Sequence, residues 1–86
     1  MKKFELLLKA LANKRRLAVL QYLKNQKEAT VGEISEAIRL SFRSTSRHLG
    51  VLSHADVLEK EQRGTEVYYR IVSRQDPTLS HVISRI

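Results

Sequence analysis

Hydrophobic residues recur with a helical period at both ends of the chain. Residues 2–12 have apolar side chains at i, i+3, i+4 and i+7, the spacing of one helix face, namely Phe4, Leu7, Leu8 and Leu11. Residues 77–86 repeat this spacing with Leu79, Val82, Ile83 and Ile86. Asp76 suits an N-cap and Pro77 suits the first helical position. We therefore expect amphipathic helices at about 2–12 and 77–86, and a further helix that begins after Asn13.

Two short helices are predicted in the middle of the chain, over about residues 30–55. Thr30 and Glu33 match a capping box, so a helix should begin there and end near Ile38. Ser41 is a second N-cap, and the helix after it should run to about Ala55. The connection between them is only Arg39-Leu40-Ser41. Such a short connection is what a helix-turn-helix motif requires.

The hydrophobic pattern changes from a helical period to alternation after Asp56. In the run 66–72, apolar and polar residues alternate with a period of two, which is typical of a strand. Gly64 can supply the positive φ that a tight turn needs. Residues of about 57–72 are therefore expected to form a β-hairpin with Arg63 at its tip. Arg70 is placed to pair across this hairpin with Glu59 or Glu61.

Length and composition indicate one small domain over residues 1–86. Hydrophobic residues make up 42% of the 86 residues, which is enough for a packed core. A chain of this size buries only about 60% of its unfolded surface, so a partner surface would add stability. The absence of Cys excludes a disulfide scaffold, a thiolate metal site and a cysteine nucleophile. No apolar run approaches the ~18 residues of a membrane span, and we expect a cytoplasmic protein with no membrane partner.

Positive charge is concentrated in one stretch. The formal net charge is +7, and the 19 residues between Glu36 and Asp56 contain no carboxylate. The same stretch holds Arg39, Arg43, Arg47, His48 and His54. Such an uncompensated field attracts polyanions, although an ordinary solvated helix face is the alternative reading. A second basic cluster, Lys14-Arg15-Arg16, suits capping, solvent exposure or phosphate contact.

The outer side of the second central helix has the residue types that bind duplex DNA. Arg can read guanine with two hydrogen bonds, and Ser hydroxyls and helix N-termini suit phosphate oxygens. The expected DNA contacts are Ser41, Arg43, Ser44, Ser46, Arg47 and His48 on the helix and Arg63 on the hairpin. His48 has an alternative role, because it can pack partly beneath the first helix of the motif.

Three stretches together resemble the ArsR-type family of winged-helix transcriptional repressors. They are Leu11 to Leu17, Ser41 to Leu49 followed by Leu52, and Arg63 to Ile71. The resemblance covers about residues 7–72. It implies a mostly α fold with a small β-hairpin wing, a winged helix-turn-helix that forms a homodimer. The implied dimer interface lies on the first and last helices, at Phe4, Leu7, Leu8, Leu79, Val82, Ile83 and Ile86.

The chain departs from the family pattern at two points. Many members sense metals, but residues 30–36 contain no thiolate, and the last helix offers only Asp76 and His81 as ligand types. A zinc site usually needs three or four ligands, so we expect no metal effector and no cofactor. Phe42 is bulkier than the polar residue common at its place in the family. We expect it to pack against the first helix of the motif, leaving less direct base reading there.

The leading interpretation is therefore a sequence-specific DNA-binding regulator, a repressor that binds a palindromic operator as a dimer. The alternative is a winged-helix module that docks onto protein or RNA. The acid-free stretch disfavours this, because docking faces more often mix charges and expose apolar residues. An enzyme is not expected, because the sequence contains no nucleophile–base–acid set and no Gly-rich phosphate loop.

Overall fold

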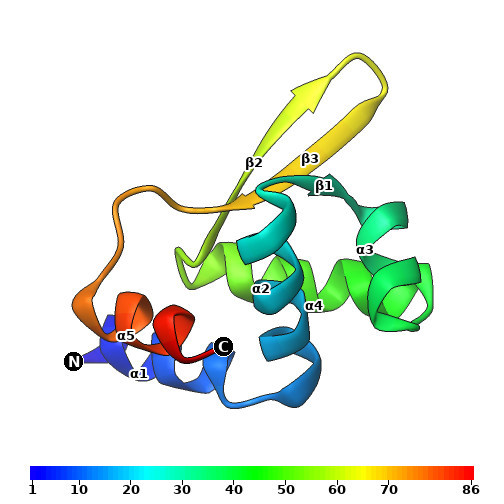
Figure 1. Ribbon diagram of the computed structural model, residues 1–86. Helices are drawn as coiled ribbons and strands as arrows, with labels where there is room; N and C mark the ends of the chain where they lie inside the picture. The colour runs from blue at the N-terminus through cyan, green and yellow to red at the C-terminus, as the bar shows by residue number, and fades with distance from the viewer.

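The structure, a computed structural model that describes residues 1–86, contains five helices and one three-stranded antiparallel sheet (Figure 1). In chain order the elements are α1 (Lys2–Leu11), α2 (Lys14–Gln26), β1 (Ala29–Thr30), α3 (Val31–Ile38), α4 (Phe42–His54), β2 (Leu58–Arg63), β3 (Glu66–Ile71) and α5 (Pro77–Arg85). The predicted helix-turn-helix is therefore α3 and α4, and the predicted wing is the β2–β3 hairpin.

The helices begin at the residues that the sequence predicted as caps. The Asn13 side chain accepts hydrogen bonds from the first backbone N–H groups of α2. Thr30 forms a complete capping box at the start of α3. Ser41 accepts from the N–H of Ser44 at the start of α4, and Asp76 caps α5 with proline in its first turn. Local side-chain chemistry thus sets where these helices begin, including the start of α4 after the short turn.

The wing is tied to the rest of the molecule by a strand that sequence reasoning missed. Residues Ala29–Thr30 form β1, which pairs with β3, so the strand order is β1-β3-β2. Two residues are too few to show an alternating pattern. The hairpin turn contains Gly64 at a φ of 64°, as predicted. The hairpin projects beyond the helices (Figure 1), and β1 pairs with the middle of β3.

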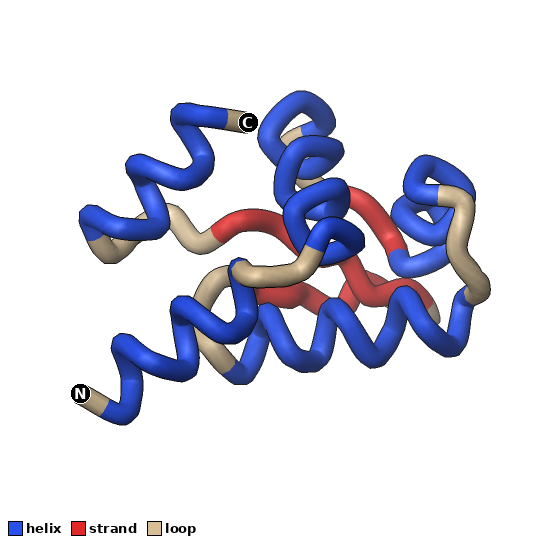
Figure 2. The backbone as a smooth tube through the Cα atoms, turned by 90° about the horizontal axis from the view of Figure 1, so that it is seen from below, coloured by secondary structure: helices blue, strands red, loops and turns tan.

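The core is built mainly from leucines of α2 and α4 and from Ile34 of α3, joined by side chains from every other element except the outer part of the wing. Fully buried members include Leu20, Leu23, Ile34, Leu49 and Leu52. The terminal helices α1 and α5 lie at one end of the molecule, and α3 and the start of α4 lie at the other (Figure 2). No helix has the length and apolar character that a bilayer span requires.

Burial corrects three sequence expectations. Leu7 and Leu79 were assigned to the dimer interface, but they are only 6% and 1% exposed within one chain. They point into the subunit's own core because each of the helices α1 and α5 has to pack one side against its own subunit, and only the other side is left for a partner. Phe42 was expected to pack against α3, yet it is 62% exposed. It is the first residue of α4, and its side chain extends past the end of the packed interface between α3 and α4.

Candidate nucleic-acid interface

The exposed side of α4 carries two arginines without partners. Arg43 and Arg47 are exposed, one turn apart, and neither forms a hydrogen bond or an ion pair with another side chain. Together with Ser44 they line an open polar hollow of about 350 Å³. The opposite side of α4 buries Thr45, Leu49 and Leu52. The packing of this side therefore holds the arginines on a rigid helix facing outward.

The start of α4 presents backbone donors on the same side as these arginines. Ser41 is exposed and its hydroxyl accepts only the Ser44 N–H, at 3.1 Å. Ser44 and Ser46 are half-buried. The first turn of a helix leaves N–H groups unpaired and carries partial positive charge, so this end suits a phosphate oxygen. The structure thus brings five of the expected DNA contacts, Ser41, Arg43, Ser44, Ser46 and Arg47, together on one helix.

Arg39, which was not among the expected contacts, is a further exposed arginine in the turn before α4. It ends α3 in the left-handed conformation, with φ 56° and ψ 52°, where glycine is the usual residue. Its side chain is exposed and makes no hydrogen bond or ion pair. Its position inside the acid-free stretch between Glu36 and Asp56 was the signal in the sequence that could have found it.

His48 is half-buried at the junction of α4 and α2 rather than free on the outer side. Its Nδ1 lies 3.2 Å from a terminal guanidinium nitrogen of Arg16. Burial lowers the pKa of the His48 imidazole, and the positive charges of Arg16, Arg47 and Arg15 lower it further. The ring is therefore neutral near pH 7. Because Arg16 is a donor only, Nδ1 accepts and the proton lies on Nε2.

The basic cluster at the start of α2 holds helices together. Arg16 donates from Nε to the Ala10 carbonyl at 2.6 Å and from a terminal nitrogen to the Lys9 carbonyl at 3.2 Å. Arg15 reaches the carbonyl of Ile38, the last residue of α3, at 3.4 Å. Arg15 and Arg16 thus fix the positions of α1, α3 and α4 around α2, and only Lys14 of this cluster is exposed.

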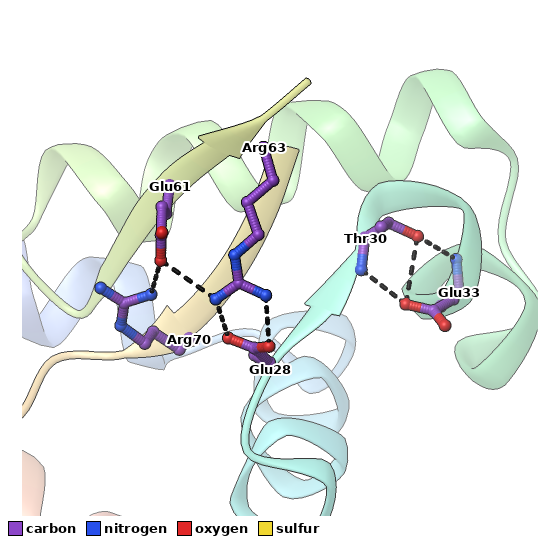
Figure 3. Close-up of polar contacts among 6 residues, drawn as sticks. All are labelled: Glu28, Thr30, Glu33, Glu61, Arg63 and Arg70. Atoms are coloured by element: carbon purple, nitrogen blue, oxygen red, sulfur yellow. Dashed lines mark hydrogen bonds and ion pairs between the residues drawn. The ribbon is translucent and has the colours of Figure 1, made fainter. Parts of the chain in front are cut away.

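Arg63, which the sequence offers as a DNA contact on the wing, is paired with carboxylates of the same chain. Its guanidinium forms two hydrogen bonds to the Glu28 carboxylate, at 2.7 and 2.8 Å, and one to Glu61 at 3.0 Å (Figure 3). It also lies over the Tyr68 ring, 4.5 Å from the centroid. Sequence reasoning did not find this pairing, because Glu28 is 35 residues away in sequence and reaches Arg63 only through the pairing of β1 with β3.

The arginines of the wing are paired with carboxylates in a network of two arginines and three glutamates. Arg70 pairs with Glu59 at 3.5 Å and with Glu61 at 3.0 Å, as the sequence predicted. The hydrogen bond from Arg63 is the main cause that lowers the pKa values of Glu28 and Glu61, and these carboxylates in turn raise the pKa of Arg63. The strong positive field therefore belongs to α4 and the turn before it, and the wing contributes little to it.

Comparison with known proteins agrees with this arrangement. Residues 11–61 match a family described as a helix-turn-helix domain. The transcriptional activator HlyU of Vibrio cholerae serotype O1 is 32% identical over 80 residues, a match that covers 93% of this chain and 73% of that protein. The arsenical resistance operon repressor of Bacillus subtilis strain 168 is 32% identical over 69 residues, 80% of this chain and 66% of the repressor.

A solved structure extends the similarity to nearly the whole chain. It is the homodimeric winged helix-turn-helix DNA-binding domain (fragment 1–100) of a possible ArsR-family transcriptional regulator from Mycobacterium bovis. The identity is 30%, the TM-score is 0.83, and the match covers 98% of this chain and 74% of that one. The family match, the curated relatives and the exposed cationic helix lead to one conclusion: this chain belongs to the ArsR-type family of winged-helix, DNA-binding transcriptional regulators.

Proposed function

We propose that the chain represses transcription by binding a palindromic operator as a homodimer. The observation that carries this proposal is the pair Arg43 and Arg47, exposed on α4 and free of any carboxylate. In helix-turn-helix proteins the second helix enters the major groove, where arginine can bind guanine O6 and N7. We expect Arg39 and the N-terminus of α4 to contact the flanking phosphates.

The proposed DNA contacts differ in their roles. Arg43 and Arg47 read bases, whereas Ser41, Ser44 and Ser46 bind backbone oxygens close to the helix. His48 acts mainly through its contact with Arg16, which sets how α4 is seated. Arg63 orients the wing through Glu28 and Glu61, and it contacts DNA only if a phosphate displaces one of these carboxylates.

Dimerisation is proposed through the outward sides of the terminal helices. Phe4 and Leu8 are 44% and 45% exposed and lie one turn apart on α1. Val82, Ile83 and Ile86 on α5 are half-buried and add apolar surface at the same end of the molecule. Exposed apolar residues clustered in this way favour a protein contact. The dimer then presents two α4 helices to two half-sites.

Selection of bound sequences from a random DNA duplex pool tests the whole proposal. A homodimer should select inverted repeats whose half-sites are about one helical turn apart, ~34–36 Å. Placing the selected site over a promoter should lower transcription in a purified system when the protein is added. Selection of no consensus, or of a single unrepeated half-site, would contradict the dimeric operator reading.

A further inference from the structure

The aromatic ring at the start of the recognition helix has no partner within the chain. Phe42 is 62% exposed, whereas the other large apolar residues of α4 are buried or half-buried. It precedes Arg43 directly and lies three residues after Arg39, in the stretch that has no carboxylate. The ring is thus a large apolar group next to an exposed arginine, and it lies outside the packed core of the subunit.

The geometry of α4 places this ring at the edge of the surface that faces DNA. At 3.6 residues per turn, Phe42 and Ser46 lie along one side of the row formed by Arg43 and Arg47. The residues at the N-terminus of a recognition helix are those that reach base edges. The ring therefore enters the groove together with Arg43 when α4 docks.

The space beside Phe42 suits an uncharged group. An open hollow of about 300 Å³ separates the ring from the wing and is lined by the apolar Val31 and Val67. Glu66 also lines it, and this carboxylate has no ion-pair partner. An unpaired carboxylate repels phosphate, so the DNA backbone is disfavoured at this place. A base edge carries no net charge, so it can occupy the hollow beside Phe42.

We propose that Phe42 is a specificity-determining residue that recognises the C5-methyl group of a thymine in the major groove. This inference rests on the proposed function and adds a base preference to it. The thymine methyl is the apolar group on the base edges of the major groove, and phenylalanine is among the residues that contact it. A protein partner is disfavoured as the occupant, because the ring is flanked by the unpaired cations Arg39 and Arg43.

Replacement of thymine by deoxyuridine tests the proposal, because it removes the methyl group and leaves every hydrogen bond. In the selected operator each thymine of one half-site is replaced in turn, and affinities are measured by titration. Burial of one methyl-sized group corresponds to about fourfold in affinity. The wild-type protein is expected to lose affinity by about fourfold when the replaced thymine is at one or two positions near the guanine contacted by Arg43. Replacement of the other thymines should leave the affinity unchanged.

Two variants distinguish the contribution of the Phe42 ring to thymine recognition from the contribution of the residues around it. Phe42→Ala is expected to bind the thymine and deoxyuridine duplexes equally, whereas Phe42→Leu keeps an apolar side chain and part of the discrimination. Because Phe42 is exposed, both variants should fold, which circular dichroism checks. The proposal is overturned if the wild type binds all duplexes equally, or if Phe42→Ala still discriminates at the same position. If the wild type binds no duplex at all, the proposed function itself fails.

Discussion

Individual residues of α4 divide between packing and recognition within a few positions of one another. Arg43 and Arg47 are exposed, His48 is half-buried against Arg16, and Thr45 and Leu49 are fully buried. A substitution in this helix therefore affects either stability or DNA binding according to its position in the helical turn. Thr45 illustrates the packing side, because its hydroxyl oxygen is buried and has no hydrogen-bond partner.

Thr45→Val should stabilise the fold. Valine has nearly the shape of threonine and removes a polar group whose unsatisfied burial costs about 1–3 kcal/mol. We expect the free energy of unfolding to rise by about 1 kcal/mol and Tm to rise by about 4–8 °C. Thermal unfolding followed by circular dichroism measures both.

The same substitution at Thr30 serves as the control. The Thr30 hydroxyl accepts from the Glu33 N–H in the capping box. Thr30→Val should therefore lower stability by about 1 kcal/mol. A loss of stability in Thr45→Val would show that its hydroxyl has a partner that the protein needs.

At the scale of elements, the local features were predictable and the long-range contacts were not. The caps Asn13, Ser41 and Asp76 act within three residues of themselves, so sequence reasoning located the helix starts. The pairing of Arg63 with Glu28 depends on β1, which is too short to leave a pattern. The exposure of Phe42 depends on where α3 ends relative to α4. The spacing of apolar residues in the sequence does not predict this relative position.

The seating of α4 on α2 should depend on pH through His48. Its folded-state pKa lies below the unfolded value of about 6.5, mainly because of burial. In the range between the two pKa values the unfolded chain binds more protons, so stability rises with pH. The contribution of His48 to the free energy of unfolding is expected to be fully present above about pH 6.5. It should decrease as the pH is lowered toward the folded-state pKa of His48. Urea unfolding at a series of pH values measures this.

His48→Asn isolates the contribution of this ring. The asparagine oxygen can accept from Arg16 near the position of Nδ1, and the side chain does not titrate. The slope of stability against pH below about pH 6.5, the unfolded-state pKa of histidine, should become smaller in this variant. Glu28 and Glu61 titrate below their usual range, so their contribution is lost at lower pH and does not overlap. An unchanged slope would mean that His48 titrates equally in both states.

At the scale of the whole molecule, the proposed function uses one surface at each end. The α4 surface carries the exposed arginines, and α1 exposes the apolar side chains of Phe4 and Leu8. Adjacent residues of α1 distinguish the proposed dimer contact from the subunit core. Leu8 is 45% exposed, whereas Leu7 is 6% exposed.

Leu8→Glu and Leu7→Ala should therefore have different effects. A charge in an apolar dimer interface disfavours association, so Leu8→Glu is expected to sediment as one 9.9 kDa chain and to remain folded. The wild type should sediment at twice that mass. Leu7→Ala should lower the stability of the subunit by about 2–5 kcal/mol, because it leaves a cavity in the core. Wild-type sedimentation as a single chain would contradict the dimer and the palindrome together.

The central claim is that the exposed arginines of α4 bind duplex DNA, and the salt dependence of affinity tests it most directly. Each neutralised phosphate lowers log K by about 0.9 per unit of log salt concentration. Arginines that read bases also lie close to phosphates. Their replacement should therefore lower the affinity for DNA and make the dependence of log K on salt concentration less steep. The test compares the wild type with Arg43→Ala, Arg47→Ala and the control Arg74→Ala, an exposed arginine on the loop before α5. Lower affinity and a shallower slope in the two α4 variants, with neither changed in the control, is the expected result. Unchanged affinity and slope in both α4 variants would contradict the account.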